Sequence, residues 1–216
     1  MVFGKIEYLN LLPFHVFMKR FTKSSQQSMS MRYRRGVPSK INKEFAFKRV
    51  DAAFISSVGA KKHKHVNLGI IAKKEVLSVL VKPSNDYVSD IESATSNVLA
   101  KVLKVNGEVI IGDKALKYYL TGGEHIDLAK EWNKKFHLPF VFALLCYHKD
   151  AKTYKKIEKQ FLKREVKVPF YMLKDASKKT GISPRDILHY LTYISYNFDA
   201  KAQKGLETFY KKASIR

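Results

Sequence analysis

The sequence predicts an α/β fold, and three observations support this prediction. Short apolar segments alternate with helical patterns over residues 1–81, an order that implies a mainly parallel sheet with helices on its faces. Several of these segments end in small polar residues directly before a helix, as at Asn10 and Ser56. After a strongly apolar strand at residues 138–145, most of the chain shows helical spacing. We therefore expect a sheet followed by a helical C-terminal region.

The first strand–helix junction carries Asn10. Residues 4–12 predict an apolar strand with Asn10 near its carboxyl end, and Pro13 fits the first turn of a helix that runs through Phe21. Open α/β sheets bind ligands at the carboxyl ends of their strands, where helix N-termini also point. Asn10 is therefore either a ligand contact or a residue that only closes the turn through its side chain.

The next elements repeat this arrangement. Residues 27–33 alternate apolar and polar side chains, which is the period of a half-buried strand. A helix is expected over residues 38–50. A short strand over residues 52–55 then ends at the hydroxyls of Ser56 and Ser57, a second junction of the same kind.

Residues 68–72 and 76–81 predict two further strands. Ser78 interrupts the second of them with a polar side chain, and a buried hydroxyl needs a partner. That partner is either a backbone acceptor or a bound ligand.

Residues 82–86, Lys-Pro-Ser-Asn-Asp, are the best candidate for a crossing between two lobes. Beyond them we expect a strand over residues 87–91 and a helix over residues 97–104, which Ser93 or Thr95 caps. The start of this helix is a ready site for a carboxylate or a phosphate.

A strand over residues 109–111 ends in Gly112 and Asp113, before a helix over residues 115–120. Asp113 again stands at a strand end. It is either the N-cap of that helix or a ligand contact.

These elements suggest two lobes. The first comprises residues 1–82 and 138–216, including the C-terminal helices, and the smaller second α/β lobe comprises residues 83–137. Within the C-terminal region, Gly181 is expected to end one helix, and Ser183-Pro184 to cap and begin the next.

The composition is strongly basic, with 41 Lys and Arg against 19 Asp and Glu and a formal charge of +22. Such a charge attracts phosphates, acidic membranes and polycarboxylates. The lysines are spread in ones and twos, so we interpret the charge as background rather than as a nucleic-acid-binding surface. Lys5 and Glu7 interrupt any secretory segment, and no apolar run reaches the roughly 20 residues that cross a bilayer.

We therefore expect a cytoplasmic monomer or homodimer without a membrane or nucleic-acid partner. The single Cys146 follows two leucines, which predicts a buried, unreactive thiol. None of the seven histidines has a cysteine or carboxylate at metal spacing, so we expect no metal and no cofactor.

The candidate chemistry consists of small, neutral polar groups at strand ends. The sequence has neither a Gly-rich phosphate loop nor a Gly-x-Ser-x-Gly motif. A site of amides and hydroxyls binds an anion through hydrogen bonds and helix termini, with little acid or base of its own. The residues that fit this description are Asn10, Ser56, Ser57, Ser78, Thr95 and Ser96.

Several motifs occur together in a specific order. They are Gly-x-Ile-x-Tyr-Leu-Asn-x-x-Pro at 4–13, Asp-x-Ala-x-Ile-Ser-Ser at 51–57, Ser78, Ser-Ala-Thr-Ser at 93–96, Ile-Gly-Asp-x-Ala-Leu at 111–116, Trp132 followed by Leu-Pro-Phe-Val-Phe-Ala at 138–143, Tyr-Leu-Thr at 190–192 and Gly-Leu-x-x-Phe-Tyr at 205–210. In this order and spacing they resemble the chorismate dehydratases of the futalosine route to menaquinone. The resemblance covers nearly the whole chain.

The resemblance implies a fold similar to type 2 periplasmic binding proteins. It also implies a lyase that converts chorismate, a small dicarboxylate, to 3-[(1-carboxyvinyl)oxy]benzoate. In this family the enolpyruvyl carboxylate of the substrate is thought able to take the proton, which would explain why no histidine or glutamate stands out.

The resemblance further implies roles for single residues. Asn10 would orient the substrate and its leaving hydroxyl, and Ser78 would hydrogen-bond to the reacting ring or a carboxylate. Further substrate contacts from the two lobes are expected at Ser56, Ser57, Thr95, Ser96, Gly112 and Asp113.

The sequence departs from the family between residues 104 and 109, where relatives usually carry a longer insertion, so the second lobe is trimmed. Alternative functions are a later pathway enzyme of the same fold, similar to 1,4-dihydroxy-6-naphthoate synthase and dependent on a histidine base, and a non-catalytic anion- or solute-binding protein. Nucleic-acid binding through the basic surface is a third.

Overall fold

The computed structural model describes residues 1–23 and 31–215. Their strands form two sheets. One contains β1 (Val2–Lys5), β2 (Arg32–Arg35), β3 (Ala52–Ser56), β4 (His65–Ala72), β8 (Phe140–Tyr147) and β9 (Ile194–Asn197). The other contains β5 (Val79–Lys82), β6 (Glu108–Ile111) and β7 (Ile126–Asp127). The strand orders are β2-β1-β3-β8-β4-β9 and β6-β5-β7.

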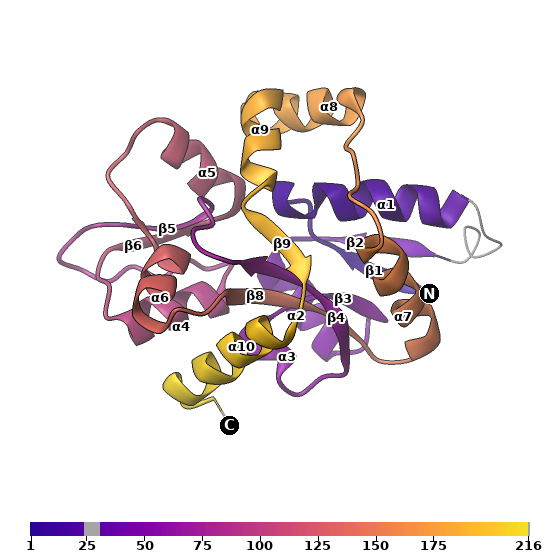
Figure 1. The fold of residues 1–216 in the computed structure, drawn as a ribbon, viewed down its shortest axis with the longest axis horizontal. Coiled ribbons are helices and arrows are strands. Elements are labelled where there is room, and N and C mark those ends of the chain that lie inside the picture. Colours follow the sequence, from indigo (N-terminus) through magenta and orange to yellow (C-terminus); the bar gives the residue numbers. More distant parts are fainter. Residues whose placement is uncertain (24–30, 216) are drawn as a thin grey trace.

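The helices separate into three groups (Figure 1). The 3₁₀ turn η1 (Leu9–Leu11) and helices α1 (Leu12–Lys23), α2 (Pro38–Ala46) and α3 (Ser57–Ala60) accompany the first strands of the larger sheet. Helices α4 (Ala94–Leu103), α5 (Gly112–Leu120) and α6 (Leu128–Phe136) accompany the smaller sheet. Helices α7 (Ala151–Leu162), α8 (Phe170–Thr180), α9 (Pro184–Leu191) and α10 (Ala200–Lys212) follow β8, and α8 and α9 project at the top of the view in Figure 1.

The larger sheet is parallel only in part. Strands β2, β1 and β3 are parallel, as the alternation of strands and helices predicts. The chain then returns from the smaller sheet through β8, which inserts between β3 and β4 and runs antiparallel to both. Strand β9 is antiparallel to β4. The prediction of a mainly parallel sheet is therefore wrong beyond β3, because it did not include the direction of this return.

The smaller sheet begins earlier than the predicted crossing. Strand β5 pairs with β6 and β7, so the chain leaves the larger sheet at residues 73–78 and not at residues 82–86. The division into two lobes stays a prediction, with its first crossing moved to this earlier position. The chain returns to the larger sheet at residues 137–139.

Two predicted strands differ from the structure. Of the segment 27–33, residues 27–30 lie outside the described residues, and the four positions of β2 are all exposed. Residues 87–91 form no strand, and only Val88 forms a bridge, with Glu108. The side chain of Asn97 hydrogen-bonds both the N–H and the C=O of Asp90, which draws the backbone away from the sheet.

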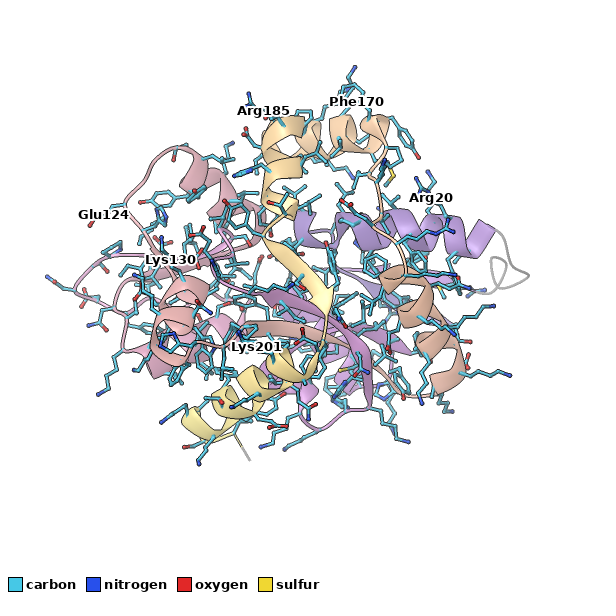
Figure 2. The ribbon with its side chains drawn as sticks, viewed as in Figure 1. Arg20, Glu124, Lys130, Phe170, Arg185 and Lys201 are labelled. Atoms are coloured by element: carbon cyan, nitrogen blue, oxygen red, sulfur yellow. The ribbon has the colours of Figure 1, made fainter. Side chains whose placement is uncertain are left out.

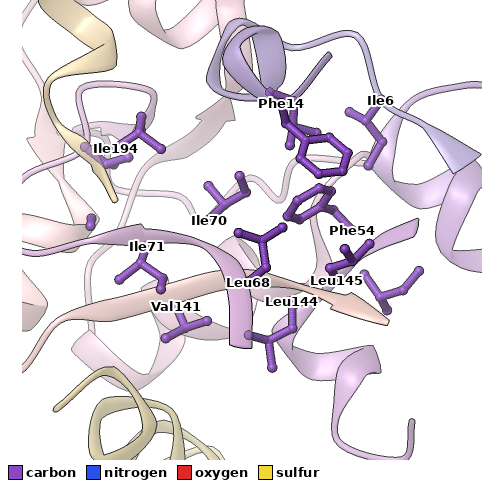
Figure 3. Packing of buried hydrophobic residues seen from close by; sticks show 14 of the residues in the cluster. Ile6, Phe14, Phe54, Leu68, Ile70, Ile71, Val141, Leu144, Leu145 and Ile194 are labelled. Atoms are coloured by element: carbon purple, nitrogen blue, oxygen red, sulfur yellow. The ribbon is translucent and has the colours of Figure 1, made fainter. Parts of the chain in front are cut away.

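One part of the core of the larger sheet lies between its strands and α1 (Figure 3). Phe14 on α1 meets Phe54 on β3 edge to face, with ring centroids 5.0 Å apart. Leu68 on β4 and Leu145 on β8 are fully buried nearby. Cys146 is also fully buried, which raises the pKa of its thiol to about 12 and confirms the predicted buried thiol.

Basic side chains are distributed over the molecule. The four basic residues that Figure 2 labels are all exposed and lie on different elements: Arg20 on α1, Lys130 on α6, Arg185 on α9 and Lys201 on α10. This arrangement agrees with the interpretation of the charge as spread over the surface. Within the described part of the chain, every helix is too short or too polar to cross a bilayer.

Helix α10 packs closely on the segment that leads into β8. A Cβ atom at Gly205 would lie 2.2 Å from the carbonyl oxygen of Pro139, so only glycine allows this approach. Phe209, one turn later, contacts Phe140 with ring centroids 5.0 Å apart, and Trp132 on α6 lies 6.0 Å from Phe209. Gly205 therefore brings the C-terminal helix against β8.

The Gly205→Ala variant tests this contact. Alanine favours an isolated helix by about 1 kcal/mol over glycine. Here the clash with the Pro139 carbonyl should dominate and destabilise the protein by about 1–3 kcal/mol, measured by urea unfolding. Lys204→Ala, at an exposed position of the same helix, is the control and should change stability by less than about 0.5 kcal/mol. A more stable Gly205→Ala protein would contradict the packing.

His15 on α1 gives the stability a pH dependence. Its Nε2 lies 2.8 Å from the carbonyl oxygen of Ile6, and burial lowers the pKa of the ring to about 4. In the unfolded chain the pKa is close to 6.5, so between these values the unfolded state binds more protons. Stability should therefore fall as the pH decreases from about 6.5 to about 4.

The His15→Gln variant should lose the part of the pH dependence that His15 contributes, which amounts to about 2–3 kcal/mol of unfolding free energy. Unfolding free energies of both proteins are measured across this range, and the difference between them isolates His15 from other titrating groups. His189→Gln, at an exposed position, controls for the loss of a histidine as such. Parallel pH profiles for wild type and His15→Gln would rule out the buried neutral imidazole.

Candidate active site

A cavity of about 80 Å³ lies where η1, the start of β5 and the N-termini of α4 and α5 meet. Residues from the elements of both sheets line it. Among the described residues, the lining has hydroxyl and amide groups but no carboxylate, imidazole or ammonium group. The polar residues of the lining are Tyr8, Asn10, Ser56, Ser78, Ser93 and Ser96.

Asn10 lies in η1 and not at the end of a strand, because β1 already ends at Lys5. The backbone carbonyl of Asn10 accepts a hydrogen bond from the Tyr196 hydroxyl at 2.7 Å. The side-chain oxygen Oδ1 is buried and has no hydrogen-bond partner among the described residues. A buried polar atom without a partner is rare and costly in a folded protein, so this amide is suited to receive a ligand.

The turn that carries Asn10 is held by an acidic residue of α5. The N–H of Leu9 donates to Oδ1 of Asp113 at 3.0 Å. Burial raises the pKa of Asp113 to about 6, an effect that this hydrogen bond partly opposes. Asp113 lies in the first turn of α5 and is not its N-cap, which is Ile111.

Ser78 precedes β5 and does not lie inside the strand. Its Oγ is 2.8 Å from the hydroxyl of Tyr190 on α9, and the side chain is 2% exposed. The turn before it contains Leu77 in the left-handed region, with φ 61°. Asp127 accepts hydrogen bonds from the N–H groups of Val76 and Leu77, at 2.9 and 2.7 Å, and so holds this turn in place.

Asp127 also caps α6 through the N–H groups of Ala129 and Lys130. Four backbone donors thus surround one carboxylate. Burial nevertheless raises the pKa of Asp127, against the effect of these hydrogen bonds.

Ser56, at the end of β3, is fixed by Asn42 of α2. The amide nitrogen of Asn42 donates to Ser56 Oγ at 2.9 Å, and the Ser56 N–H donates to Asn42 Oδ1 at 3.2 Å. The side-chain amide of Asn42 therefore donates to the hydroxyl oxygen of Ser56 and accepts from its backbone N–H. The hydroxyl hydrogen of Ser56 has no acceptor in these bonds and is available to a ligand.

The N-terminus of α4 presents Ser93 and Ser96. Of the two predicted candidates, Ser93 rather than Thr95 is the N-cap, and its Oγ accepts a hydrogen bond from the Ser96 N–H at 3.1 Å. The two hydroxyls are 2.7 Å apart. Helix N-termini favour anions, so this corner of the cavity is suited to a carboxylate.

Gly112 and Tyr8 pack against each other at the cavity wall. Gly112 has φ 66°, and a Cβ atom there would lie 2.8 Å from the Tyr8 ring. The Tyr8 hydroxyl donates a hydrogen bond to Glu92. The pKa of this phenol is raised, first by burial and second by the hydrogen bond to Glu92. Glycine is required at this position by both the torsion angle and the ring.

The structure brings together Asn10, Ser56, Ser78, Ser96 and Gly112, all of which line the cavity. The other three predicted contacts lie outside the lining. Ser57 donates to the Val141 carbonyl, Thr95 Oγ1 accepts from the Val58 N–H at 3.2 Å, and Asp113 holds Leu9.

Sequence reasoning missed four residues that support the cavity. Tyr190 belongs to the Tyr-Leu-Thr motif without a role of its own and Tyr196 belongs to no motif, although each forms one hydrogen bond at the site. Tyr8 was part of the N-terminal motif without a role of its own. Asn42 had no signal, because its place in a helix says nothing of its distance from β3.

The sequence is similar to proteins of menaquinone biosynthesis. A family model described as menaquinone biosynthesis matches residues 87–214. A chorismate dehydratase of Campylobacter jejuni is 46% identical over 216 residues, covering 98% of this chain and 96% of the relative. A chorismate dehydratase of Thermus thermophilus is 22% identical, covering 96% of this chain and 93% of the relative.

Solved structures show the same fold. A protein of Archaeoglobus fulgidus superposes with a TM-score of 0.73 at 12% identity, covering 99% of this chain and 96% of that structure. The alkanesulfonate-binding protein of Xanthomonas axonopodis superposes with a TM-score of 0.59 at 10% identity, covering 100% and 94%. The fold is therefore of the periplasmic-binding-protein type. The family model matches more than half of this chain, and a relative is 46% identical along nearly all of it. The protein therefore belongs to the menaquinone-biosynthesis family that includes the chorismate dehydratases.

Proposed function

We propose that this protein is a carbon–oxygen lyase that removes water from chorismate to form 3-[(1-carboxyvinyl)oxy]benzoate. The observation that carries this proposal is the neutral cavity between the two sheets, in which a buried amide oxygen of Asn10 has no partner among the described residues. The family membership supports the choice of chorismate.

The reaction demands little of the protein's own acids and bases. In chorismate the ring carboxylate is conjugated to a double bond, which acidifies the proton on the carbon that bears the enolpyruvyl ether. When that C–H bond breaks, its electron pair enters the ring. The neighbouring C–O bond then breaks, hydroxide leaves with a proton as water, and the ring becomes aromatic. The gain in aromaticity drives the elimination.

Asn10 and Ser78 are the residues that we propose act on the reacting atoms. The free Oδ1 of Asn10 would accept a hydrogen bond from the hydroxyl of the bound substrate and so orient it, and its N–H₂ would donate to the substrate. The hydroxyl of Ser78 would donate to the ring carboxylate while its oxygen accepts from Tyr190. Donors fixed around a developing charge are the largest contribution that most active sites make.

The second carboxylate of the substrate would bind at the N-terminus of α4. Ser93 and Ser96 lie there on the lining of the cavity, and the helix macrodipole adds a favourable field. Ser56, already held by Asn42, would complete the contacts from the larger sheet. Both sheets therefore contribute hydrogen bonds to one dianion.

The enolpyruvyl carboxylate of chorismate would accept the proton. The described lining of the cavity offers only amide, hydroxyl and phenol groups, and burial raises the pKa of the Tyr8 phenol. A base carried by the substrate would explain why the lining needs no carboxylate or imidazole of its own. A histidine base, which the later enzyme of the same pathway would use, is absent from the described lining.

The test is to mix the purified protein with chorismate and follow conversion of the cyclohexadiene to a benzoate by ultraviolet absorbance and mass. We expect one equivalent of product per equivalent of chorismate. Chorismate that binds and is recovered unchanged would instead identify a solute-binding protein.

Single substitutions then test the two proposed residues. Asn10→Ala and Ser78→Ala should each reduce kcat by roughly 10²- to 10³-fold, the usual effect of removing one donor from a charge-stabilising site. Asn85→Ala and Ser89→Ala, the same substitutions at exposed positions of the same fold, should leave kcat within about twofold. Full turnover in Asn10→Ala would remove that residue from the mechanism.

A further inference from the structure

We infer that Asp113 is a positioning residue, which holds the backbone of η1 so that Asn10 faces the substrate only when the two sheets are together. This inference rests on the proposed function for its kinetic consequence. Its structural part, the dependence of the η1 turn on a carboxylate of α5, stands on the contacts themselves.

Turn η1 cannot satisfy its own backbone. It is three residues long, its preceding residue Tyr8 supplies no side-chain cap, and the first N–H groups of a helical turn have no partner within it. Asp113 Oδ1 provides that partner for Leu9 at 3.0 Å. Leu9 directly precedes Asn10, so the carboxylate fixes the backbone at the base of the amide side chain.

Tyr8 makes a second contact with the smaller sheet's elements. Its hydroxyl donates to Glu92, in the segment before α4, and its ring packs on Gly112. On the other side, the Asn10 carbonyl accepts from Tyr196 on β9 of the larger sheet. Turn η1 is therefore bonded to both sheets through consecutive residues. If the sheets separate, the bonds to Asp113 and Glu92 break, and the position of Asn10 is no longer fixed.

A direct contact between Asp113 and the substrate fits the structure less well. The residue is outside the cavity that Asn10 and Ser78 line, and instead lines a separate cavity of about 280 Å³ beside Lys5, His15 and Lys179. A carboxylate at the substrate would also repel both carboxylates of a dianion. A backbone acceptor, by contrast, needs only the oxygen atom.

This difference defines the experiment. Asp113→Asn keeps an oxygen acceptor for the Leu9 N–H but loses the charge, whereas Asp113→Ala loses both. The first measurement is hydrogen exchange of the Leu9 amide by nuclear magnetic resonance, which does not depend on activity. Exchange should be slow in wild type and in Asp113→Asn, and at least tenfold faster in Asp113→Ala.

The second measurement is steady-state dehydration of chorismate. Asp113→Ala should reduce kcat by about 30-fold or more with less than about threefold change in KM, and Asp113→Asn should restore kcat to within about threefold of wild type. Tyr8→Phe, which keeps the ring on Gly112 but loses the hydroxyl, should reduce kcat several-fold and also accelerate Leu9 exchange. Asp175→Ala, which removes a carboxylate from the same separate cavity, is the matched control and should match wild type.

Two outcomes overturn the inference. Unchanged Leu9 exchange in Asp113→Ala would show that the carboxylate does not hold the turn. Equal loss of kcat in Asp113→Asn and Asp113→Ala would show that the charge itself acts on the substrate. If wild type fails to dehydrate chorismate, the proposed function fails, while the exchange measurement still decides whether Asp113 holds η1.

Discussion

Two carboxylates that accept backbone N–H groups, the buried Asp127 and the half-buried Asp113, determine the shape of the site. Asp127 binds the N–H of Leu77, and Asp113 binds the N–H of Leu9. In each case the donor is the residue directly before one of the two proposed catalytic side chains. Asp127 is buried and accepts four backbone N–H groups. A buried carboxylate is costly unless it is hydrogen-bonded, so the contacts of Asp127 tolerate little displacement. The cavity therefore owes its geometry to acidic residues that lie outside its lining.

The charged side chains of the protein and the polar groups of the cavity lie in different places. The protein carries a formal charge of +22, displayed on exposed side chains such as Arg20 and Lys201. The described lining of the cavity is neutral. A dianion would be attracted by the long-range field and then held by oriented dipoles, whose hydrogen bonds are stronger where water is excluded. For such a ligand the basic surface would act at long range and the uncharged cavity at contact.

Local patterns predicted much of the site from the sequence. Ser93 caps α4 and Gly181 ends α8, because capping chemistry depends on a few adjacent residues. Asn10 and Ser78 were recognised by their place in motifs, and both line the cavity.

Non-local pairing could not be predicted in this way. Strand β8 is apolar whether it runs parallel or antiparallel to β3, so its direction left no trace in the pattern. Tyr190 reaches Ser78 across 112 positions of the chain, and Asn42 reaches Ser56 from a helix. Nothing local distinguishes such residues from ordinary core or surface positions. Asp113 was recognised as a polar residue at a strand end, but nothing local to it indicated that it accepts a hydrogen bond from the Leu9 N–H, 104 positions away.

The chain passes between the two sheets twice, at residues 73–78 and at residues 137–139. Two adjacent tethers permit rotation about the line that joins them and oppose twisting and sliding. Each passage contains a non-glycine residue in the left-handed region, Leu77 with φ 61° and His137 with φ 55°. Such torsions cost about 1–2 kcal/mol each. If the smaller sheet rotates relative to the larger one, that rotation would have to be absorbed in the backbone angles of these two passages.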